Sequence, residues 1–156
     1  MLQDKVRTGT YRDGIMNNAI DFKDKVVMDV GSGSGILSIF AAQAGAKKVW
    51  AIEASDMADF SRILIKHNKL EHIIEVVQAK IEDIDKSLIA EKSVDVIVSE
   101  PLGTYLFNER MLETYVIARD KFLKPECRSM MFPCEADFMI MPMSDQDLYY
   151  EILNKA

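Results

Sequence analysis

Short apolar stretches alternate along the chain with stretches of helical spacing, and this alternation limits the fold more than any other feature. Four stretches are short, nearly continuous and rich in β-branched residues, at 25–30, 48–52, 74–78 and 94–98. Runs of this kind are typical of strands that are buried on both faces. Helical spacing is found at 36–44, 57–68 and 108–123. Because strands that alternate with helices form right-handed βαβ units, we predict an α/β fold with a doubly wound, mostly parallel sheet.

The residues after 124 follow a different pattern, which predicts two further strands and a helix. The strands are expected at 128–133 and 136–141. Ser144 opens a segment with the spacing of a capping box. We predict that a helix begins there, with Leu148 and Ile152 on its buried face.

The composition favours some classes of partner and disfavours others. The chain has 156 residues and a net charge of −6, which gives no electrostatic attraction to nucleic acid and suits a cationic substrate. No apolar run approaches the roughly 20 residues that a membrane-spanning helix needs. Cys127 and Cys134 lack the spacing of metal ligands. We therefore expect no metal site and no membrane contact, and free thiols in a reducing compartment rather than a disulfide.

A glycine-rich loop follows the first predicted strand directly. It reads Asp-Val-Gly-Ser-Gly-Ser-Gly from residue 29, with glycines at 31, 33 and 35. Glycine tolerates positive φ and lets a ligand approach the backbone without a Cβ in the way. The loop leads into a helix whose N-terminus offers free N–H groups, at the edge of the sheet where α/β proteins bind ligands. The loop is therefore a candidate ligand site.

The spacing of the glycines distinguishes between nucleotide ligands. A dinucleotide loop of the form G-x-G-x-x-G requires a third glycine where this chain has Ile36. A P-loop requires Gly-Lys-Ser/Thr, which does not follow here. The remaining pattern, an acid at Asp29 followed by Gly-x-Gly-x-Gly, resembles the S-adenosylmethionine-binding loop of the class I methyltransferases.

Two further acids fit an adenosine ligand. Glu53 ends the second predicted strand, where a carboxylate can accept hydrogen bonds from both ribose hydroxyls. Glu82 comes just past the third strand and can approach an adenine edge. Each has a plainer interpretation, because Glu53 can be a solvated acid at a strand end, and Glu82 with Asp83 can simply begin a loop.

Longer segments resemble the protein arginine N-methyltransferases, and within them most closely the coactivator-associated arginine methyltransferases. The resemblance covers almost the whole chain. The segments are Arg-Thr-Gly-Thr-Tyr from 7, Asp-Phe-Lys-Asp-Lys from 21, Gly-Ile-Leu-Ser from 35, Phe-Ala-Ala-Gln-Ala-Gly-Ala from 40, Ile-Glu-Ala-Ser from 52, Ser-Glu-Pro-Leu-Gly from 99 and Leu-Phe-Asn-Glu-Arg-Met-Leu from 106.

The resemblance implies S-adenosyl-L-methionine as cofactor and S-adenosyl-L-homocysteine as its product. Arg7 would hold the methionyl carboxylate by bidentate pairing, although by itself it reads as a solvated surface arginine. Met111 would line the site of methyl transfer, although methionine at helical spacing can equally be core. The implied cofactor-contacting residues are Arg7, Asp29, Gly31, Ser32, Gly33, Gly35, Ile36, Leu37, Glu53, Ala54, Lys80, Ile81, Glu82, Glu100 and Met111.

Glu100 and Glu109 match the family's catalytic pair of acids on the loop after the fourth strand. Without the family they would be unremarkable loop acids. A substrate guanidinium has a pKa above 12, so removing its proton beforehand at neutral pH costs more than about 7 kcal/mol. Two carboxylates can hold the guanidinium group and draw its positive charge toward the nitrogens that they touch. The remaining nitrogen is then richer in electrons and attacks the methyl group, and its proton leaves as the bond forms. Orientation and electrostatics would supply most of the rate.

Three features depart from the family pattern. The family has an aromatic helix before the arginine that matches Arg7, and a β-barrel whose Thr-His-Trp loop completes the site. His67 and His72 lie around the second helix and cannot supply that histidine. Thr104-Tyr105 stands where the family has an aromatic residue directly after the glycine, so either Tyr105 compensates or the acceptor pocket is altered. We therefore expect a cofactor-binding core at 1–133 and the start of a truncated barrel at 134–156.

The resemblance implies methyl transfer to arginine in proteins such as histone tails or RNA-binding proteins, with an asymmetric dimethyl product. It also implies a nuclear and cytoplasmic location and a homodimeric full-length protein, while this chain alone would be weakly active or inactive. The alternative is a non-catalytic module that binds S-adenosylmethionine or a partner. A small-molecule methyltransferase is disfavoured by Ser-Glu-Pro-Leu-Gly from 99.

Overall fold

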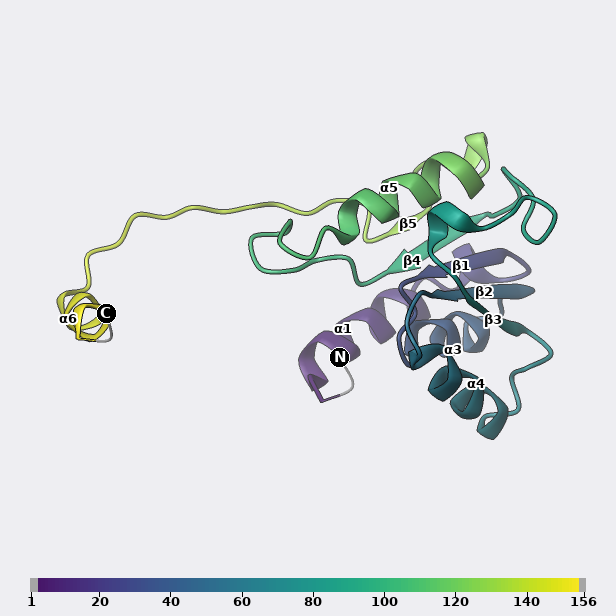
Figure 1. Cartoon of the computed structure of the whole chain (residues 1–156), viewed down its shortest axis with the longest axis horizontal. Coiled ribbons are helices and arrows are strands. Elements are labelled where there is room, and N and C mark those ends of the chain that lie inside the picture. The colour runs from purple at the N-terminus through teal and green to yellow at the C-terminus, as the bar shows by residue number, and fades with distance from the viewer. Residues whose placement is uncertain (1–2, 155–156) are drawn as a thin grey trace.

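A computed structural model describes residues 3–154 of the chain. Its centre is a five-stranded sheet with the order β3-β2-β1-β4-β5, and every pair of neighbouring strands is parallel (Figure 1). This confirms the predicted doubly wound sheet. β2 and β4 lie on opposite sides of β1, so the topological switch point lies between β1 and β4. The strands are β1 (Val26–Val30), β2 (Lys48–Glu53), β3 (Ile74–Gln78), β4 (Val96–Ser99) and β5 (Met131–Phe132).

Helices cover both faces of the sheet and enclose two hydrophobic cores (Figure 1). Along β1, Val27 points into the core beneath α1, α3 and α4, whereas Met28 points into the core beneath α5. Burial on both faces explains why the strands read as continuous apolar runs. The helices are α1 (Lys5–Met16), α2 (Ala19–Phe22), α3 (Ile36–Gln43), α4 (Met57–His67), α5 (Met111–Phe122) and α6 (Gln146–Leu153), with 3-10 turns η1 (Ile81–Asp83) and η2 (Pro125–Cys127).

The helix α1 was not predicted from the sequence, although it carries Arg7. Its only buried residue is Ile15, and its sequence includes Gly9 and Gly14, so it shows no apolar stripe. Glycine in a helix interior is also unfavourable relative to alanine. The usable signal was Asp4, whose side chain accepts a hydrogen bond from the Arg7 N–H at 2.9 Å and so caps the helix.

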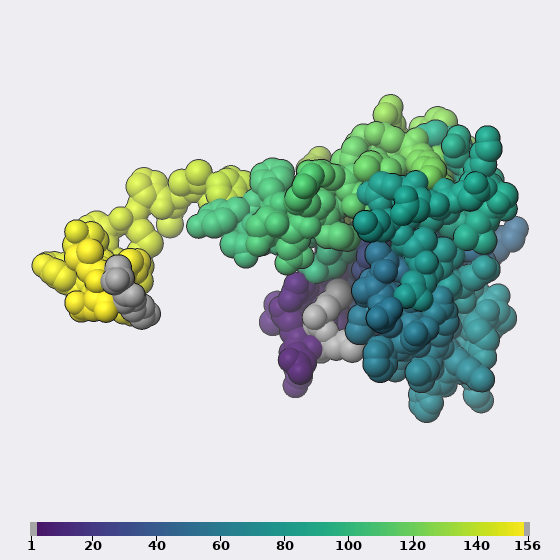
Figure 2. All heavy atoms as spheres, in the orientation of Figure 1, coloured from purple at the N-terminus to yellow at the C-terminus, as the bar shows by residue number. Residues whose placement is uncertain are grey.

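The predicted sixth strand at 136–141 is wrong. These residues pair with no other strand among the residues that the structure describes, and they run away from the body of the molecule as an extended segment (Figure 2). A strand requires a hydrogen-bonded neighbour, and this segment has none in the described part of the chain. The predicted fifth strand at 128–133 forms over two residues only, where Met131 and Phe132 pair with Ile97 and Val98.

The terminal helix is present, but two details of its prediction are wrong. Asp145, and not Ser144, caps it, because the Asp145 side chain accepts a hydrogen bond from the Leu148 N–H at 2.9 Å. The face with Leu148 and Ile152 was expected to be buried and is exposed. The helix lies at the end of the extended segment, away from either core (Figure 1). No helix in the part of the chain that the structure describes is long and apolar enough to cross a membrane.

Candidate functional site

The glycine-rich loop leaves β1 in a conformation that requires glycine. Gly31, Gly33 and Gly35 have φ angles of 69°, 53° and 79°, a region that other residues rarely adopt. A Cβ at Gly31 would lie 2.6 Å from the Met111 methyl carbon, and one at Gly35 would lie 2.6 Å from the Ser61 hydroxyl oxygen. The loop therefore packs closely against both α5 and α4.

Asp29 supports this loop from inside the protein. Its side chain is 1% exposed, and one carboxylate oxygen accepts hydrogen bonds from the Ser38 N–H at 2.9 Å and the Ser38 hydroxyl at 2.7 Å. Because Gly35 at the start of α3 has no side chain, Asp29 does the work of a capping residue. Burial raises the pKa of Asp29 to about 7, although the bonds from Ser38 oppose this. Its other oxygen is buried without a partner among the described residues.

A cavity of about 700 Å³ opens at the switch point, beside the carboxyl ends of β1, β2 and β4. It lies between the glycine loop, η1 and the first turn of α5. Its lining includes Gly31, Glu53, Ala54, Lys80, Ile81, Glu82, Glu100, Glu109 and Met111, all predicted as site residues. The predicted residues Arg7, Asp29, Ser32, Gly33, Gly35, Ile36 and Leu37 do not line it. Val30, Ile52, Ala79, Asp83 and Thr114 line it without having been predicted.

Glu53 joins the two loops that border the cavity. One carboxylate oxygen accepts the Gly33 N–H at 2.8 Å, and the other accepts the Ser55 N–H at 2.8 Å and the Ser55 hydroxyl at 2.7 Å. A carboxylate has about four acceptor positions, so these three bonds leave one position, on the oxygen that accepts the Gly33 N–H, for a ligand donor. Glu53 therefore faces the cavity already oriented.

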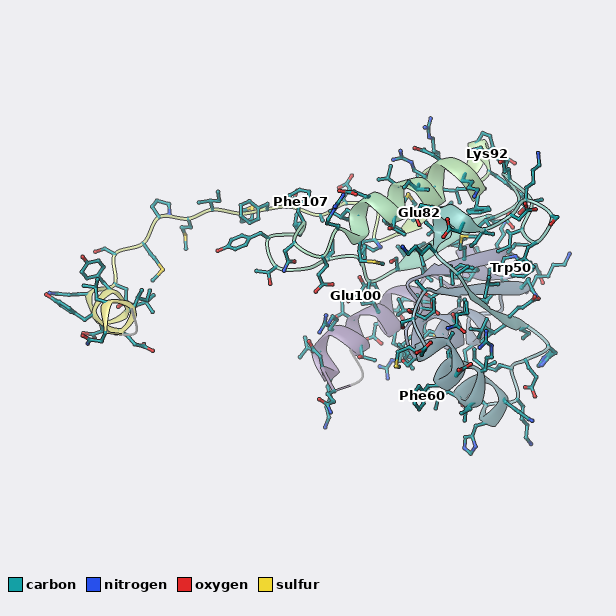
Figure 3. The ribbon with its side chains drawn as sticks, in the orientation of Figure 1. Trp50, Phe60, Glu82, Lys92, Glu100 and Phe107 are labelled. Carbon is teal, nitrogen blue, oxygen red and sulfur yellow. The ribbon has the colours of Figure 1, made fainter. Side chains whose placement is uncertain are left out.

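Glu82 is held against α5 by two contacts. The Thr114 hydroxyl donates to the Glu82 carboxylate at 3.3 Å, and the Lys121 ammonium donates to the Glu82 and Ile84 carbonyl oxygens at 3.1 and 2.7 Å. Glu82 lies beneath α5 in Figure 3. Thr114 follows Met111 by one helical turn, and this spacing is the signal that could have identified it.

Glu100 and Glu109 approach the same cavity from the two ends of one loop. Glu100 follows β4, and in Figure 3 it lies between the end of that strand and α1. The Arg7 guanidinium pairs with it at 3.3 Å, between Nη1 and Oε2. Glu109 lies just before α5 and has no ion pair among the residues that the structure describes. The neighbouring Arg110 turns away from the cavity toward Glu113, at 2.8 Å.

Tyr105 does not line the cavity. It has a φ of 54° in the turn between Gly103 and Leu106, and it is 73% exposed. Its ring meets the edge of Phe138 at a centroid distance of 5.6 Å. Tyr105 therefore contacts the extended segment and is absent from the wall of the cavity.

The two histidines and the two cysteines do not line the cavity. Among residues 3–154, no group of three or more His, Cys, Asp or Glu side chains could hold a metal ion. His67 and His72 are exposed. Cys127 and Cys134 are both free thiols.

Comparisons with known proteins find methyltransferases. A family model described as "Ribosomal protein L11 methyltransferase (PrmA)" matches residues 15–115. The "Histone-arginine methyltransferase CARMER" of Drosophila ananassae is 56% identical over 156 residues, which are 100% of this chain and 28% of that protein. The chain thus spans well under a third of the length of this relative.

Solved structures of related enzymes superimpose on the chain. Protein arginine methyltransferase 10 of Arabidopsis thaliana gives a TM-score of 0.76 at 50% identity, over 80% of this chain and 35% of that one. The Trypanosoma brucei PRMT1 enzyme–prozyme complex with AdoHcy gives a TM-score of 0.79 at 47% identity, over 85% of this chain and 40% of that one.

Proposed function

We propose that this chain, which belongs to the protein arginine methyltransferase family, is a cofactor-binding core that binds S-adenosylmethionine and directs its methyl group to arginine in proteins. One observation carries the proposal. A single cavity at the switch point brings Glu53 and Gly31, which suit an adenosine ligand, together with Glu100 and Glu109, which suit a guanidinium.

The volume of the cavity suits a cofactor of this size. Its volume of about 700 Å³ lies within the range of ligand sites. At Gly31 the Met111 methyl group occupies the place that a Cβ would take, so the glycine allows Met111 to pack against the loop backbone at the wall of the cavity. When bound, S-adenosylmethionine supplies an electrophilic methyl group on a sulfonium.

Each residue near the cofactor has a role in this proposal. Glu53 would hold the ribose hydroxyls, Glu82 the adenine and Arg7 the methionyl carboxylate. Ala54, Lys80, Ile81 and Met111 form the walls. Asp29, Ser32, Gly33, Gly35, Ile36 and Leu37 act indirectly, because they shape the loop and the start of α3 rather than line the cavity.

Glu100 and Glu109 would hold the acceptor guanidinium. The cavity lining carries five carboxylates (Glu53, Glu82, Asp83, Glu100 and Glu109) and one ammonium group, that of Lys80, so its charge favours cations. The two carboxylates orient the acceptor and stabilise positive charge on the nitrogens that they touch. This leaves the third nitrogen free to attack and requires no strong base.

The finer parts of the proposal rest on the family and on the printed name of the Drosophila relative. They are asymmetric dimethylation, histone tails or RNA-binding proteins as substrates, and a nuclear and cytoplasmic location. We assign residues 1–133 to the cofactor-binding core and 134–156 to the start of a barrel domain. The full-length protein would be a homodimer, and this chain alone would transfer methyl groups weakly or not at all.

Calorimetric titration of S-adenosylhomocysteine tests the cofactor site. We expect Glu53→Ala to weaken binding at least about tenfold, because the ribose loses a charged acceptor. Ser55→Ala is the matched control, since it removes only the hydroxyl bond to Glu53, and keeps both the bond from the backbone N–H of residue 55 and the carboxylate itself. Equal affinities of Glu53→Ala and the unmodified chain would refute the ribose assignment.

Gly103→Ala tests whether the loop must hold Glu109 where it is. A Cβ at residue 103 would collide with the Asn108 side-chain oxygen and lie 2.8 Å from the Glu109 Cγ. We expect this variant to bind an arginine-containing peptide about tenfold more weakly, because Glu109 is displaced. Gly9→Ala is the control, because a Cβ there meets nothing within 4 Å. Calorimetry that finds both variants equal to the parent would rule out a positional requirement on Glu109.

A further inference from the structure

Arg7 and Glu100 form an ion pair between two parts of the site that are far apart in the sequence. Arg7 lies on α1 and Glu100 follows β4, and their side chains are 41% and 21% exposed. Arg7 also contacts the Asp4 carboxylate at 3.3 Å on its own helix. Glu100 is the main cause of the raised pKa of Arg7. The charge of Arg7 is thus divided between two carboxylates.

The proposed function gives these two partners different ligands. Arg7 would bind the carboxylate of the cofactor, whereas Glu100 would bind the guanidinium of the acceptor. An acceptor guanidinium carries the same charge as Arg7 and must share Glu100 with it. A cofactor carboxylate carries the same charge as Glu100 and competes with it for Arg7. The ion pair therefore opposes acceptor binding, and the cofactor carboxylate weakens the ion pair.

We infer that Arg7 is a positioning residue for Glu100 that couples the two ligands, so that a carboxylate-bearing cofactor strengthens the binding of a cationic acceptor. This inference rests on the proposed function. By linkage, the acceptor must strengthen cofactor binding by the same factor. We expect a factor of about five, at the low end of the usual range, because Arg7 is partly exposed and solvent screens its charge.

Glu109 explains why the coupling is graded rather than complete. It has no ion pair among residues 3–154, so its charge is available to an acceptor whether or not cofactor is bound. The chain without cofactor then offers one free carboxylate and one shared with Arg7. An acceptor binds to both states, and more weakly to the state without cofactor.

Calorimetric titration of the peptide acetyl-Gly-Gly-Arg-Gly-Gly-amide into the 156-residue chain measures the coupling. The titration is repeated with saturating S-adenosylhomocysteine and with its decarboxylated analogue, S-adenosyl-3-thiopropylamine, which lacks only the carboxylate. We expect S-adenosylhomocysteine to tighten peptide binding about fivefold and the analogue to leave it unchanged. Equal tightening by both compounds would overturn the inference, because the carboxylate would then be irrelevant.

Two arginine variants on the same helix assign the effect to a residue. Arg7→Met should bind the peptide without cofactor about as tightly as the loaded parent does, and S-adenosylhomocysteine at saturation should no longer change that affinity. Arg12→Met is the matched control, since Arg12 is exposed on α1 and, within the described residues, pairs only with Asp13. It should retain the full fivefold effect. Coupling that survives in Arg7→Met would overturn the inference.

The outcomes separate this inference from the proposed function. If S-adenosylhomocysteine binds and depends on Glu53, while the peptide binds equally with and without it, the coupling is wrong and the cofactor site stands. If S-adenosylhomocysteine binds but the peptide gives no heat under any condition, the inference fails together with the acceptor half of the function. If S-adenosylhomocysteine itself does not bind, the proposed function fails first.

Discussion

Replacing Asp29 by asparagine is expected to stabilise the folded chain progressively as the pH rises from about 4 to 7. Burial raises the pKa of Asp29 from 3.8 to about 7. A folded pKa above the unfolded value means that the folded chain holds the proton more tightly, so its stability falls as pH rises through this window. One pKa unit corresponds to about 1.4 kcal/mol, so the variant should gain about 4 kcal/mol on the parent across it. Asparagine keeps an acceptor for Ser38 and carries no charge to bury.

Urea denaturation at several pH values measures this gain as the difference in unfolding free energy between variant and parent. Asp95→Asn is a control of opposite sign. Burial raises the pKa of Asp95, but bonds from Lys124 and the Val26 N–H outweigh it and lower the pKa below 3.8. The charge of Asp95 therefore stabilises the fold above about pH 4, and this contribution is lost in acid. A constant difference between Asp29→Asn and the parent at all pH values would show that Asp29 is not a buried acid.

Glutamine at residue 100 or at residue 109 is expected to lower methyl transfer to an arginine peptide about 100-fold. Glutamine preserves the shape of each side chain and one acceptor oxygen but removes the negative charge. The acceptor then loses a charge-assisted partner, and its attacking nitrogen becomes poorer in electrons. Transfer of radiolabel from S-adenosylmethionine to a histone-tail or Arg/Gly-rich peptide detects the weak turnover expected of this chain.

Glu113→Gln is the matched control for both variants. Glu113 is exposed on the first turn of α5 and pairs with Arg110, outside the cavity. It should leave transfer unchanged within about twofold. The mechanism would be wrong if Glu100→Gln retained the signal of Glu113→Gln. Without cofactor, Glu109→Gln should also lose more peptide affinity than Glu100→Gln, because Arg7 already shares Glu100.

The sequence predicts the sheet well because four strands are buried on both faces. The first residue of a strand is harder to predict. The stretch at 94–98 was expected to be one strand, but β4 begins only at Val96, and Val94 pairs separately with Leu123. The stretch at 136–141 has the same apolar character and forms no strand, since pairing depends on a neighbour that the local sequence does not reveal. The helix α1 was missed because its buried face consists of little more than Ile15.

Glu53 and Glu82 could be located because they come at or just after the ends of strands, and Glu100 and Glu109 through the family resemblance, but the directions of the acidic side chains could not be predicted. Asp29 and Val30 are neighbours at the end of β1, and alternation sends them to opposite faces. Val30 lines the cavity, whereas Asp29 points toward α3. Alternation predicts that the two side chains point to opposite faces of the sheet, but only the structure shows which face carries the cavity. The pairing of Arg7 with Glu100 could not be predicted either, because α1 and the end of β4 become neighbours only in the folded chain.

The position of the cavity at the β1–β4 junction also affects how the chain folds. Neighbouring parallel strands pair only after a long crossover has been ordered, and here that crossover includes β2 and β3. The adenosine half of the cavity belongs to the first strands, and the guanidinium half follows β4. A partly folded chain in which β4 has not yet paired with β1 would therefore contain the residues proposed to bind adenosine but not the two glutamates proposed to bind the acceptor. Such an intermediate would lack the groups that orient an arginine for methyl transfer.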